Sequence, residues 1–319
     1  MSFSLQITFD KTDMKGLVIK STGSWYLVLA PDGTTYESRI QGKFRIKGIK
    51  STNPIAVGDE VELLPEPDQS TAVITHLYPR KNYIVRRSIN LSKSVQVIAA
   101  NLDQAFLVVT LASPVTSLGF IDRFLVTAEA YDVPASIIFN KLDLFSDEGL
   151  EVLEQFQSIY TRIGYPCYQV SGLEGTHVDI LLQEMANKKT LITGHSGVGK
   201  STLINRLVPN ADLKTGAISS FSEKGKHTTT FAEMIPLPGG GFIIDTPGIQ
   251  ELGIVDIEQH ELAHFFPEFR ERLNQCRYHN CKHINEPGCV ILEAVEEGDI
   301  EPSRYQNYLS MYHGNETRN

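Results

Sequence analysis

The sequence predicts a chain of three parts: a small β-barrel, a doubly wound α/β domain, and a mainly helical C-terminal segment with a metal-binding cluster. Three observations support this division. Short strands separated by turn residues come first, continuous apolar strands then alternate with amphipathic segments, and three of the four cysteines gather within one short stretch near the end. We expect the domains to span about 1–90, 91–255 and 256–319.

The composition is that of an ordinary globular protein. Hydrophobic residues make up 41% and charged residues 21% of the chain. No apolar run reaches the roughly 18 residues that a membrane helix needs. The first residues, MSFSLQITFDKTDMKG, lack the basic and then apolar pattern of a signal peptide. We therefore expect a cytoplasmic protein without membrane contact.

Charge is unevenly distributed. The net charge of −9 argues against a generic nucleic-acid binder, yet residues 1–95 carry 13 Lys and Arg against 9 Asp and Glu. We therefore expect any RNA-facing surface in this first part, although ordinary scatter of surface charge would give a similar count. The candidate contacts are aromatic and basic residues. The alternative is that the aromatic residues belong to the core, as most aromatic residues of a small barrel do. They are Trp25, Tyr36, Lys43, Phe44 and Arg45.

Five short strands are expected in the first part, which fits a small closed barrel of the OB or SH3-like kind. Turn signals such as Pro31-Asp32-Gly33 separate them. The expected strands are 16–19, 25–29, 34–36, 60–64 and 72–75. Residues 80–87, RKNYIVRR, are expected to form the linker out of the barrel.

The second part alternates buried strands with amphipathic helices, as a parallel sheet covered on both faces requires. The expected strands are 105–109, 136–139, 168–170, 190–193 and 242–244, and the expected helices are 121–128, 148–162, 178–185 and one that begins at 202. Ligands bind such folds at the carboxyl ends of the strands, and every candidate site below follows a strand.

Residues 194–201, GHSGVGKS, complete the phosphate-loop pattern G-x4-G-K-[ST] between an apolar strand and a helix. Backbone N–H groups and the helix N-terminus favour bound phosphates. Lys200 is expected to reach the β- and γ-phosphates as a catalytic group, and the Ser201 hydroxyl to hold Mg²⁺. The nucleotide-binding residues expected here are Gly194, His195, Ser196, Gly197, Val198, Gly199, Lys200, Ser201 and Thr202.

The sequence NKLD follows the strand that ends at 139 and indicates guanine as the base. A carboxylate accepts two parallel hydrogen bonds from guanine, whereas adenine has no matching donor pair. The expected base-binding residues are Asn140, Lys141, Leu142 and Asp143. Ser171 and Gly172 end the next strand and could contact guanine O6 through the backbone.

The sequence DTPG at 245–248 is expected to provide the remaining switch groups. Asp245 would hold the magnesium shell, and the Gly248 N–H would sense the γ-phosphate. Between this element and the phosphate loop lies GKHTTT at 225–230, where one threonine is expected to complete the magnesium ligands. Spacing does not decide which one, and we take Thr229; a solvated loop without a ligand is the alternative.

These motifs occur in a rotated order, with the base-reading element before the phosphate loop and the switch element last. Behind a small barrel and ahead of a Cys/His cluster, this order resembles the RsgA (YjeQ/YloQ) family of circularly permuted bacterial GTPases over essentially the whole chain. The resemblance implies an OB-fold first domain and GTP hydrolysis that the 30S subunit stimulates during its late maturation. It also implies a zinc-binding last domain, with both flanking domains contacting 16S rRNA.

The cluster Cys-x4-Cys-x-His-x5-Cys offers three thiolates and an imidazole, a set that structural zinc sites use. It matches the family's metal cluster residue for residue, which implies the ligands Cys276, Cys281, His283 and Cys289. His279 is a competing ligand. Cys167 stands apart and is expected in the core.

Ile249 occupies the position where Ras-like GTPases carry a water-orienting glutamine, so another group or a partner must supply this role. His227 is our candidate because a neutral imidazole can position water, and the matching histidine of the family is thought to do so. The alternative is that His227 only packs or contacts RNA.

Two other functions compete with a monomeric ribosome-associated GTPase that binds GTP and GDP. The first is a nucleotide-gated RNA-binding scaffold in which hydrolysis is incidental, for which Ile249 is the best support. The second is a P-loop ATPase or small-molecule kinase, against which Asn140 and Asp143 argue.

Overall fold

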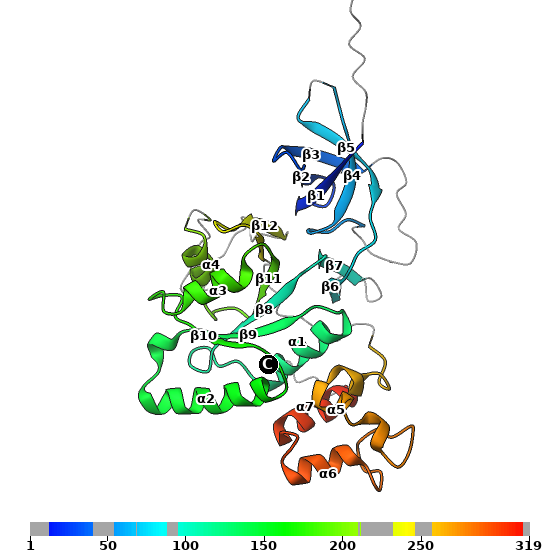
Figure 1. Cartoon of the computed structure of the whole chain (residues 1–319), viewed down its shortest axis with the longest axis vertical. Helices are drawn as coiled ribbons and strands as arrows, with labels where there is room; N and C mark the ends of the chain where they lie inside the picture. Colours follow the sequence, from blue (N-terminus) through cyan, green and yellow to red (C-terminus); the bar gives the residue numbers. More distant parts are fainter. Residues whose placement is uncertain are drawn as a thin grey trace, which may run out of the picture.

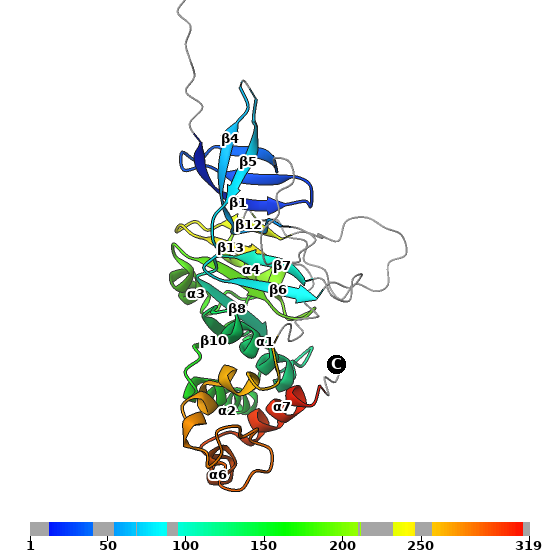
Figure 2. The same cartoon turned by 90° about the vertical axis from the view of Figure 1, so that its right-hand side faces the viewer.

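The computed structural model describes residues 13–40, 54–67, 69–87, 95–209, 211, 232–245 and 257–314. Its three parts follow one another along the longest axis, with the barrel at one end, the α/β domain in the middle and the C-terminal helices at the other end (Figures 1 and 2). None of the helices in these ranges is long and apolar enough to cross a membrane.

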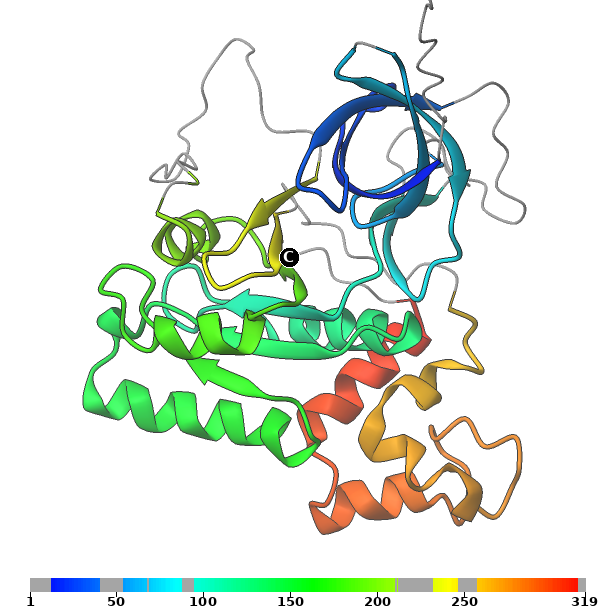
Figure 3. The ribbon, with the colours of Figure 1, turned by 45° about the horizontal axis from the view of Figure 1, so that its top comes forward.

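The first part is a closed five-stranded barrel. Its strands are β1 (Met14–Ser21), β2 (Tyr26–Leu29), β3 (Thr35–Ile40), β4 (Glu60–Pro65) and β5 (Thr71–Leu77). They run in the order β1-β2-β3-β5-β4, β4 returns to pair with β1, and only the β3–β5 pairing is parallel. This is the OB arrangement rather than the SH3-like one, and the ring is visible in Figure 3.

Alternate residues of these strands fill the barrel, as the two-residue period of a strand requires. Val61 and Leu63 of β4 are both fully buried among the core residues. Of the proposed RNA contacts, Trp25 is 46% exposed and so lies outside the core, whereas Tyr36 packs partly against it. The other three candidates, Lys43, Phe44 and Arg45, lie outside the described residues.

The segment expected to be a linker is instead a strand. β6 (Tyr83–Arg87) pairs antiparallel with β7 (Val95–Ala100) in a separate two-stranded sheet. The prediction was wrong because Ile84 is fully buried in the core of the α/β domain, and pairing with β7 satisfies the backbone of this short, charged sequence. The hairpin therefore spans the expected boundary between residues 90 and 91.

The central sheet has the order β10-β9-β8-β11-β13-β12, in which β12 alone is antiparallel to its neighbour. Its strands are β8 (Gln104–Val109), β9 (Ala135–Phe139), β10 (Cys167–Gln169), β11 (Lys189–Thr193), β12 (Glu233–Pro236) and β13 (Phe242–Asp245). The sequence did not predict β12, which also pairs with β1 of the barrel. Barrel and α/β domain thus share one eleven-stranded sheet.

Helices cover both faces of this sheet, as expected of a doubly wound fold. They are α1 (Leu118–Ala130), α2 (Asp147–Arg162), α3 (Val178–Met185) and α4 (Lys200–Leu207). Leu107 of β8 packs in the cluster that contains residues of α1 and α2, and its neighbour Phe106 packs in the cluster of α3 and α4. The continuous apolar run of β8 is therefore explained by burial on both faces.

The last part is mainly helical. Its elements are η2 (Leu262–Phe265), α5 (Pro267–Arg270), η3 (Leu273–Gln275), α6 (Val290–Glu297) and α7 (Pro302–Tyr312), and the short η1 (Leu142–Leu144) belongs to the central domain. Phe266, Phe269 and Tyr308 form its aromatic centre, with ring centroids 5.0 to 5.5 Å apart.

A buried ionic cluster joins this last part to α1. Arg304 of α7 is 1% exposed and donates to Asp122 of α1 at 2.7 Å and to Glu268 of α5 at 2.8 and 3.1 Å. Tyr160 and Asn307 donate to the same Asp122 carboxylate. Both carboxylate oxygens of Asp122 are thus hydrogen-bonded by residues outside its own helix.

The barrel joins the central domain differently, through backbone hydrogen bonds and through apolar packing of Leu17 and Ile19 of β1 against the α/β core. Val57 forms a bridge with Ala99 of β7 and accepts a 2.9 Å hydrogen bond from the Ala100 N–H. The Asn101 side chain donates to the carbonyl of Gly58 at 3.0 Å. Together with the β1–β12 pairing, these contacts hold the barrel at two places.

Candidate nucleotide-binding site and metal centre

The phosphate loop connects β11 to α4 at the carboxyl edge of the sheet, where it was expected. Gly199 has φ of +94°, and a Cβ at this position would lie 2.5 Å from Nδ2 of Asn140. A side chain here would therefore push the phosphate loop and the base-reading loop apart. The last glycine of the motif is required for the two loops to meet.

The Lys200 ammonium group is hydrogen-bonded to carbonyl groups of its own loop. It donates to the carbonyls of Gly194 at 2.6 Å and His195 at 2.8 Å. Burial lowers the pKa of Lys200, and the nearby Asp245 carboxylate opposes this effect. The lysine of the phosphate loop and the acid at the end of β13 therefore lie close together, as a magnesium-nucleotide site requires.

Asn140 connects the base-reading loop to the phosphate loop and to the loop after β10 by hydrogen bonds. It is 3% exposed, its Nδ2 donates to the Val198 carbonyl in the phosphate loop at 2.8 Å, and its Oδ1 accepts from the Gly172 N–H at 2.9 Å. Lys141, the next residue, has φ of +68°. Three segments that are far apart in the sequence are thus held at one point by one side chain.

Asp143 sits beside the end of β10. The Ser171 hydroxyl donates to its carboxylate at 2.5 Å, and the Gly172 N–H next to it is engaged by Asn140. A carboxylate placed at this edge can accept from the donors of guanine. The structure thus brings together Asn140, Asp143, Ser171 and the phosphate loop, all of which sequence reasoning had selected.

Sequence reasoning missed the loop before α1, which supports the phosphate loop from the side. Nδ1 of His195 lies 3.0 Å from the Ser196 carbonyl, so this nitrogen carries the proton, and Thr116 Oγ1 donates to the other ring nitrogen at 2.6 Å. Burial, together with Lys200 and Lys141, lowers the pKa of His195 and favours this neutral form. Phe120 meets the ring edge-on. No local pattern marks Thr116 or Phe120 for this contact.

The expected magnesium ligands are only partly within the described residues. Ser201 lies in the first turn of α4, and Asp245 ends β13. A hydroxyl and a carboxylate beside a phosphate site are the oxygen donors that Mg²⁺ prefers, so these two residues fit the ion. His227, Thr229 and Gly248 lie outside the described residues.

The structure assembles the cysteine–histidine cluster. The ligand atoms of Cys276, Cys281, His283 and Cys289 all lie within 4.8 Å of one another, and Nδ1 of His283 lies 3.6 and 3.4 Å from the first and last sulfurs. Zinc bonds of 2.0–2.3 Å in a tetrahedron place ligand atoms about 3.5–3.8 Å apart, so the set fits zinc. Burial lowers the pKa of His283 and keeps its ring in the neutral, ligating form.

The loop that carries the cluster is held from two sides. Tyr305 and Tyr308 of α7 donate to the carbonyls of His283 at 3.0 Å and Lys282 at 2.8 Å. The Glu286 carboxylate accepts from three backbone N–H groups of the same loop. Although partial burial opposes it, this hydrogen bonding lowers the pKa of Glu286 to about 2.

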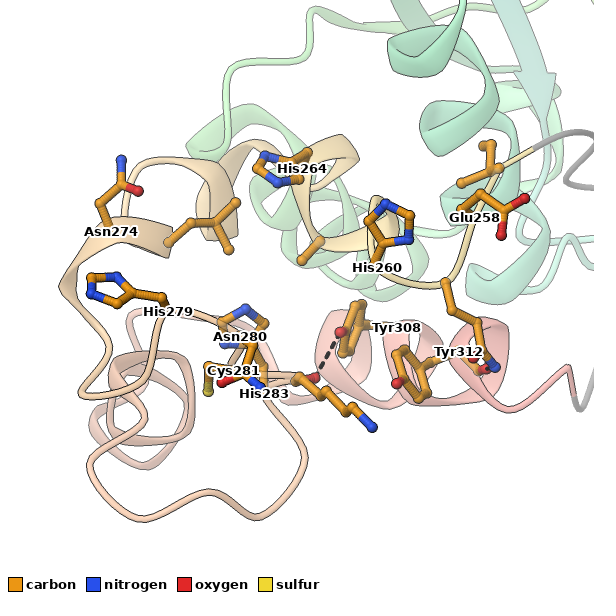
Figure 4. Close-up of a pocket in the computed structure, with 15 residues that line it drawn as sticks. Glu258, His260, His264, Asn274, His279, Asn280, Cys281, His283, Tyr308 and Tyr312 are labelled. Atoms are coloured by element: carbon orange, nitrogen blue, oxygen red, sulfur yellow. Dashed lines mark hydrogen bonds between the residues drawn. The ribbon is translucent and has the colours of Figure 1, made fainter.

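A pocket of about 830 Å³ adjoins the cluster, which forms part of its wall. Figure 4 shows His260 and His264 on one side, the loop with His279 on another, and the α7 tyrosines closing it. His279, the competing ligand, is thus a pocket residue and is not one of the four clustered groups.

The class of protein follows from this arrangement. The sheet order, the single antiparallel strand and the sites at the carboxyl edge are those of a P-loop nucleotide-binding domain, and the base-reading strand β9 precedes the phosphate-loop strand β11 in the chain. Such a domain is a circularly permuted GTPase domain.

The chain belongs to the RsgA GTPase family. It matches the RsgA N-terminal domain over residues 15–74 and the RsgA GTPase over residues 77–255. The "small ribosomal subunit biogenesis GTPase RsgA" of Bacteroides fragilis is 54% identical over 298 residues, which cover 93% of this chain and 96% of the relative. The protein of the same name from Christiangramia forsetii is 52% identical over 95% of this chain and 97% of its own.

Solved structures agree with this assignment. YjeQ from Thermotoga maritima superimposes with a TM-score of 0.78 at 34% identity, over 95% of this chain and 98% of the other. YloQ, described as a circularly permuted GTPase, gives a TM-score of 0.75 at 29% identity, over 98% of both chains. The protein is therefore a GTPase, as predicted from the rotated motifs, and the ATPase or kinase alternative is not supported.

Proposed function

We propose that this protein hydrolyses GTP to GDP and phosphate during late maturation of the 30S ribosomal subunit, and that the particle stimulates the reaction. The names of the relatives, small ribosomal subunit biogenesis GTPases, support the role. The observation that carries the nucleotide chemistry is the position of Asn140, which bonds the phosphate loop and the Gly172 backbone at once.

Each domain has a role in this proposal. The barrel, residues 1–90, and the zinc-binding domain, residues 256–319, contact 16S rRNA, and residues 91–255 bind and hydrolyse the nucleotide. The +4 charge excess of residues 1–95 in an otherwise acidic chain supports an RNA-facing barrel. The protein acts as a monomer in the cytoplasm, with a zinc ion held by the Cys₃His cluster.

The base and the phosphates are bound at opposite ends of the carboxyl edge. Asp143 accepts two hydrogen bonds from guanine, and the Ser171 hydroxyl that now donates to it keeps the carboxylate in place. The Lys200 ammonium leaves the two loop carbonyls for the β- and γ-phosphates, and its charge stabilises the transition state.

Hydrolysis requires groups around the γ-phosphate. Ser201, Thr229 and Asp245 would hold Mg²⁺, which would neutralise phosphate charge, and the Gly248 N–H would sense the γ-phosphate. His227 positions the attacking water because Ile249 has no hydrogen-bonding group. His227 belongs to this chain, but the 30S subunit positions it. Hydrolysis is therefore slow until the subunit is bound.

Exchange of Asp143 tests the base site. Asp143→Asn removes the acceptor of two charge-assisted hydrogen bonds, so affinity for GTP falls by about 100-fold. The new amide can donate to the O2 of xanthine, so affinity for XTP rises. Asp179→Asn, an exposed change on α3, is the matched control. Titration of fluorescent nucleotides measures both, and a variant that keeps its preference for GTP, or a wild-type protein that binds ATP equally well, contradicts the assignment.

A further inference from the structure

The barrel contributes a side chain to a row of residues that ends at Asp245, the proposed magnesium ligand at the carboxyl edge of the sheet. Lys20 of β1 is directly opposite Glu233 of β12, and Glu233 is directly opposite Asp245 of β13. Directly opposed residues of neighbouring antiparallel strands project from the same face, about 5 Å apart at Cβ. Lys20, Glu233 and Asp245 therefore form one cross-strand row, as the adjacency of β1, β12 and β13 in Figure 2 illustrates.

Lys20 and Glu233 form an ion pair. Nζ of Lys20 lies 2.8 Å from Oε2 of Glu233, and the two side chains are 41% and 44% exposed. Lys20↔Glu233 is also the only residue pair in the register of β1 with β12 within the described residues. The ammonium group thus comes from the barrel, whereas the carboxylate belongs to the strand that follows residues 212–231.

Glu233 places a second carboxylate beside Asp245. Like charges directly opposite one another across a sheet repel, and each raises the negative potential at the other. The Asp245 carboxylate is also near enough to Lys200 to raise the pKa of that lysine against the effect of burial. Without Lys20, this row would therefore hold two adjacent negative charges and no positive charge of its own.

We propose that Glu233 increases the affinity of this edge for Mg²⁺ and that Lys20 of the barrel offsets its charge. The seating of the barrel on β12 thereby sets the magnesium affinity of the GTPase site. Lys20 and Glu233 are positioning residues that act through Asp245. The inference rests on the proposed role of Asp245 as a magnesium ligand, and it adds that the barrel tunes this ligand.

The test uses the full-length protein and a binding measurement. The affinity for a fluorescent GDP analogue is titrated against MgCl₂, which gives the half-saturating magnesium concentration. Lys20→Met leaves Glu233 unbalanced, so this concentration falls by about two- to fivefold, the size expected for half-exposed charges. Glu233→Gln removes negative charge and raises it by a similar factor. The double variant returns close to the wild-type value.

The opposite signs distinguish charge tuning from a merely structural contact, because loss of a structural contact would weaken binding in all three variants. Lys15→Met is the matched control: Lys15 lies on the same strand and pairs at 2.6 Å with Glu60 of β4 on the barrel surface, so both partners belong to the barrel. Shifts of equal sign, or shifts no larger than that of the control, overturn the inference while leaving the proposed function intact. If the nucleotide affinity of the wild-type protein does not depend on the magnesium concentration, the proposed magnesium site itself is wrong.

Discussion

The two flanking domains are attached to the GTPase domain by different kinds of contact. The zinc-binding domain depends on Arg304, which is 1% exposed and bonded to two buried carboxylates. The barrel depends on backbone hydrogen bonds at Val57 and Gly58, on the β1–β12 pairing, on apolar packing of β1 against the α/β core and on one half-exposed ion pair. The first junction contains a buried ion cluster, with more exposed ion pairs such as Arg270–Glu129 beside it, whereas the second combines backbone hydrogen bonds with apolar packing.

This difference has consequences for how each domain can signal. Burial raises the pKa of Asp122, and the Arg304 guanidinium is the largest influence that opposes this, so each charge requires the other. Such a junction is either intact or broken. The barrel junction can change gradually, because half-exposed ion pairs contribute only about 0–1 kcal/mol. The barrel also pairs with β12, the strand next to Asp245. We therefore infer that the barrel, more than the C-terminal domain, adjusts the magnesium affinity at Asp245.

Removal of the proposed zinc ion has the largest expected effect, and it distinguishes the C-terminal domain from the barrel. Structural zinc contributes about 10–16 kcal/mol of apparent binding energy in small zinc modules, so a strong chelator, or Cys281→Ser, unfolds the loop around 276–289. The barrel keeps its fold, because no contact between described residues joins it to the cluster. Zinc content and hydrogen exchange measure the result, and Cys167→Ser is the control. Loss of barrel protection on chelation contradicts the separation.

Arg304→Met tests the buried junction. The change leaves Asp122 and Glu268 as unpaired buried carboxylates and destabilises the protein by about 3–5 kcal/mol. Arg162→Met is the control at the same junction, since Arg162 of α2 pairs with Glu301 at the start of α7 at 3.3 Å but is 59% exposed. Urea unfolding followed through the aromatic residues of the last domain compares the two. Equal effects would show that burial of the charge is not what holds this junction.

Gly58→Ala tests the barrel junction and has a smaller expected effect. Gly58 has φ of +89°, and a Cβ there would collide with the Ala100 carbonyl oxygen of β7. The cost is about 1–3 kcal/mol for the backbone conformation, with the collision in addition. Gly33→Ala carries a similar φ of +87° with nothing within 4 Å, so it isolates the collision. Thermal unfolding of both variants gives the difference, and equal shifts would mean that close approach at Gly58 is unimportant.

Most of the central domain could be predicted because its elements carry their own patterns. The helix expected at 178–185 is α3 with the same bounds, since its amphipathic spacing is local. β12 escaped prediction because four residues, EMIP, carry no period and gain their structure from pairing with β1 and β13. The sequence of β6 predicts a linker instead of a strand because charged residues surround Ile84, the residue that is buried in the core.

The candidate site shows the same limit. The phosphate loop and Asn140 belong to motifs whose chemistry requires fixed spacing, so their meeting could be anticipated. Thr116 and His195 are 79 residues apart, and Arg304 and Asp122 are 182 apart, so only the fold brings each pair together. Contacts of this kind leave no pattern in a single sequence.

Single-turnover hydrolysis of GTP, with and without isolated 30S subunits, tests the central claim most directly. The account predicts slow hydrolysis by the protein alone and a large increase with the subunits. His227→Ala is predicted to bind GTP normally and to lose the stimulation, and unchanged turnover in this variant would remove His227 from the mechanism. Absence of any stimulation of the wild-type protein would contradict the account and favour a nucleotide-gated scaffold in which hydrolysis is incidental.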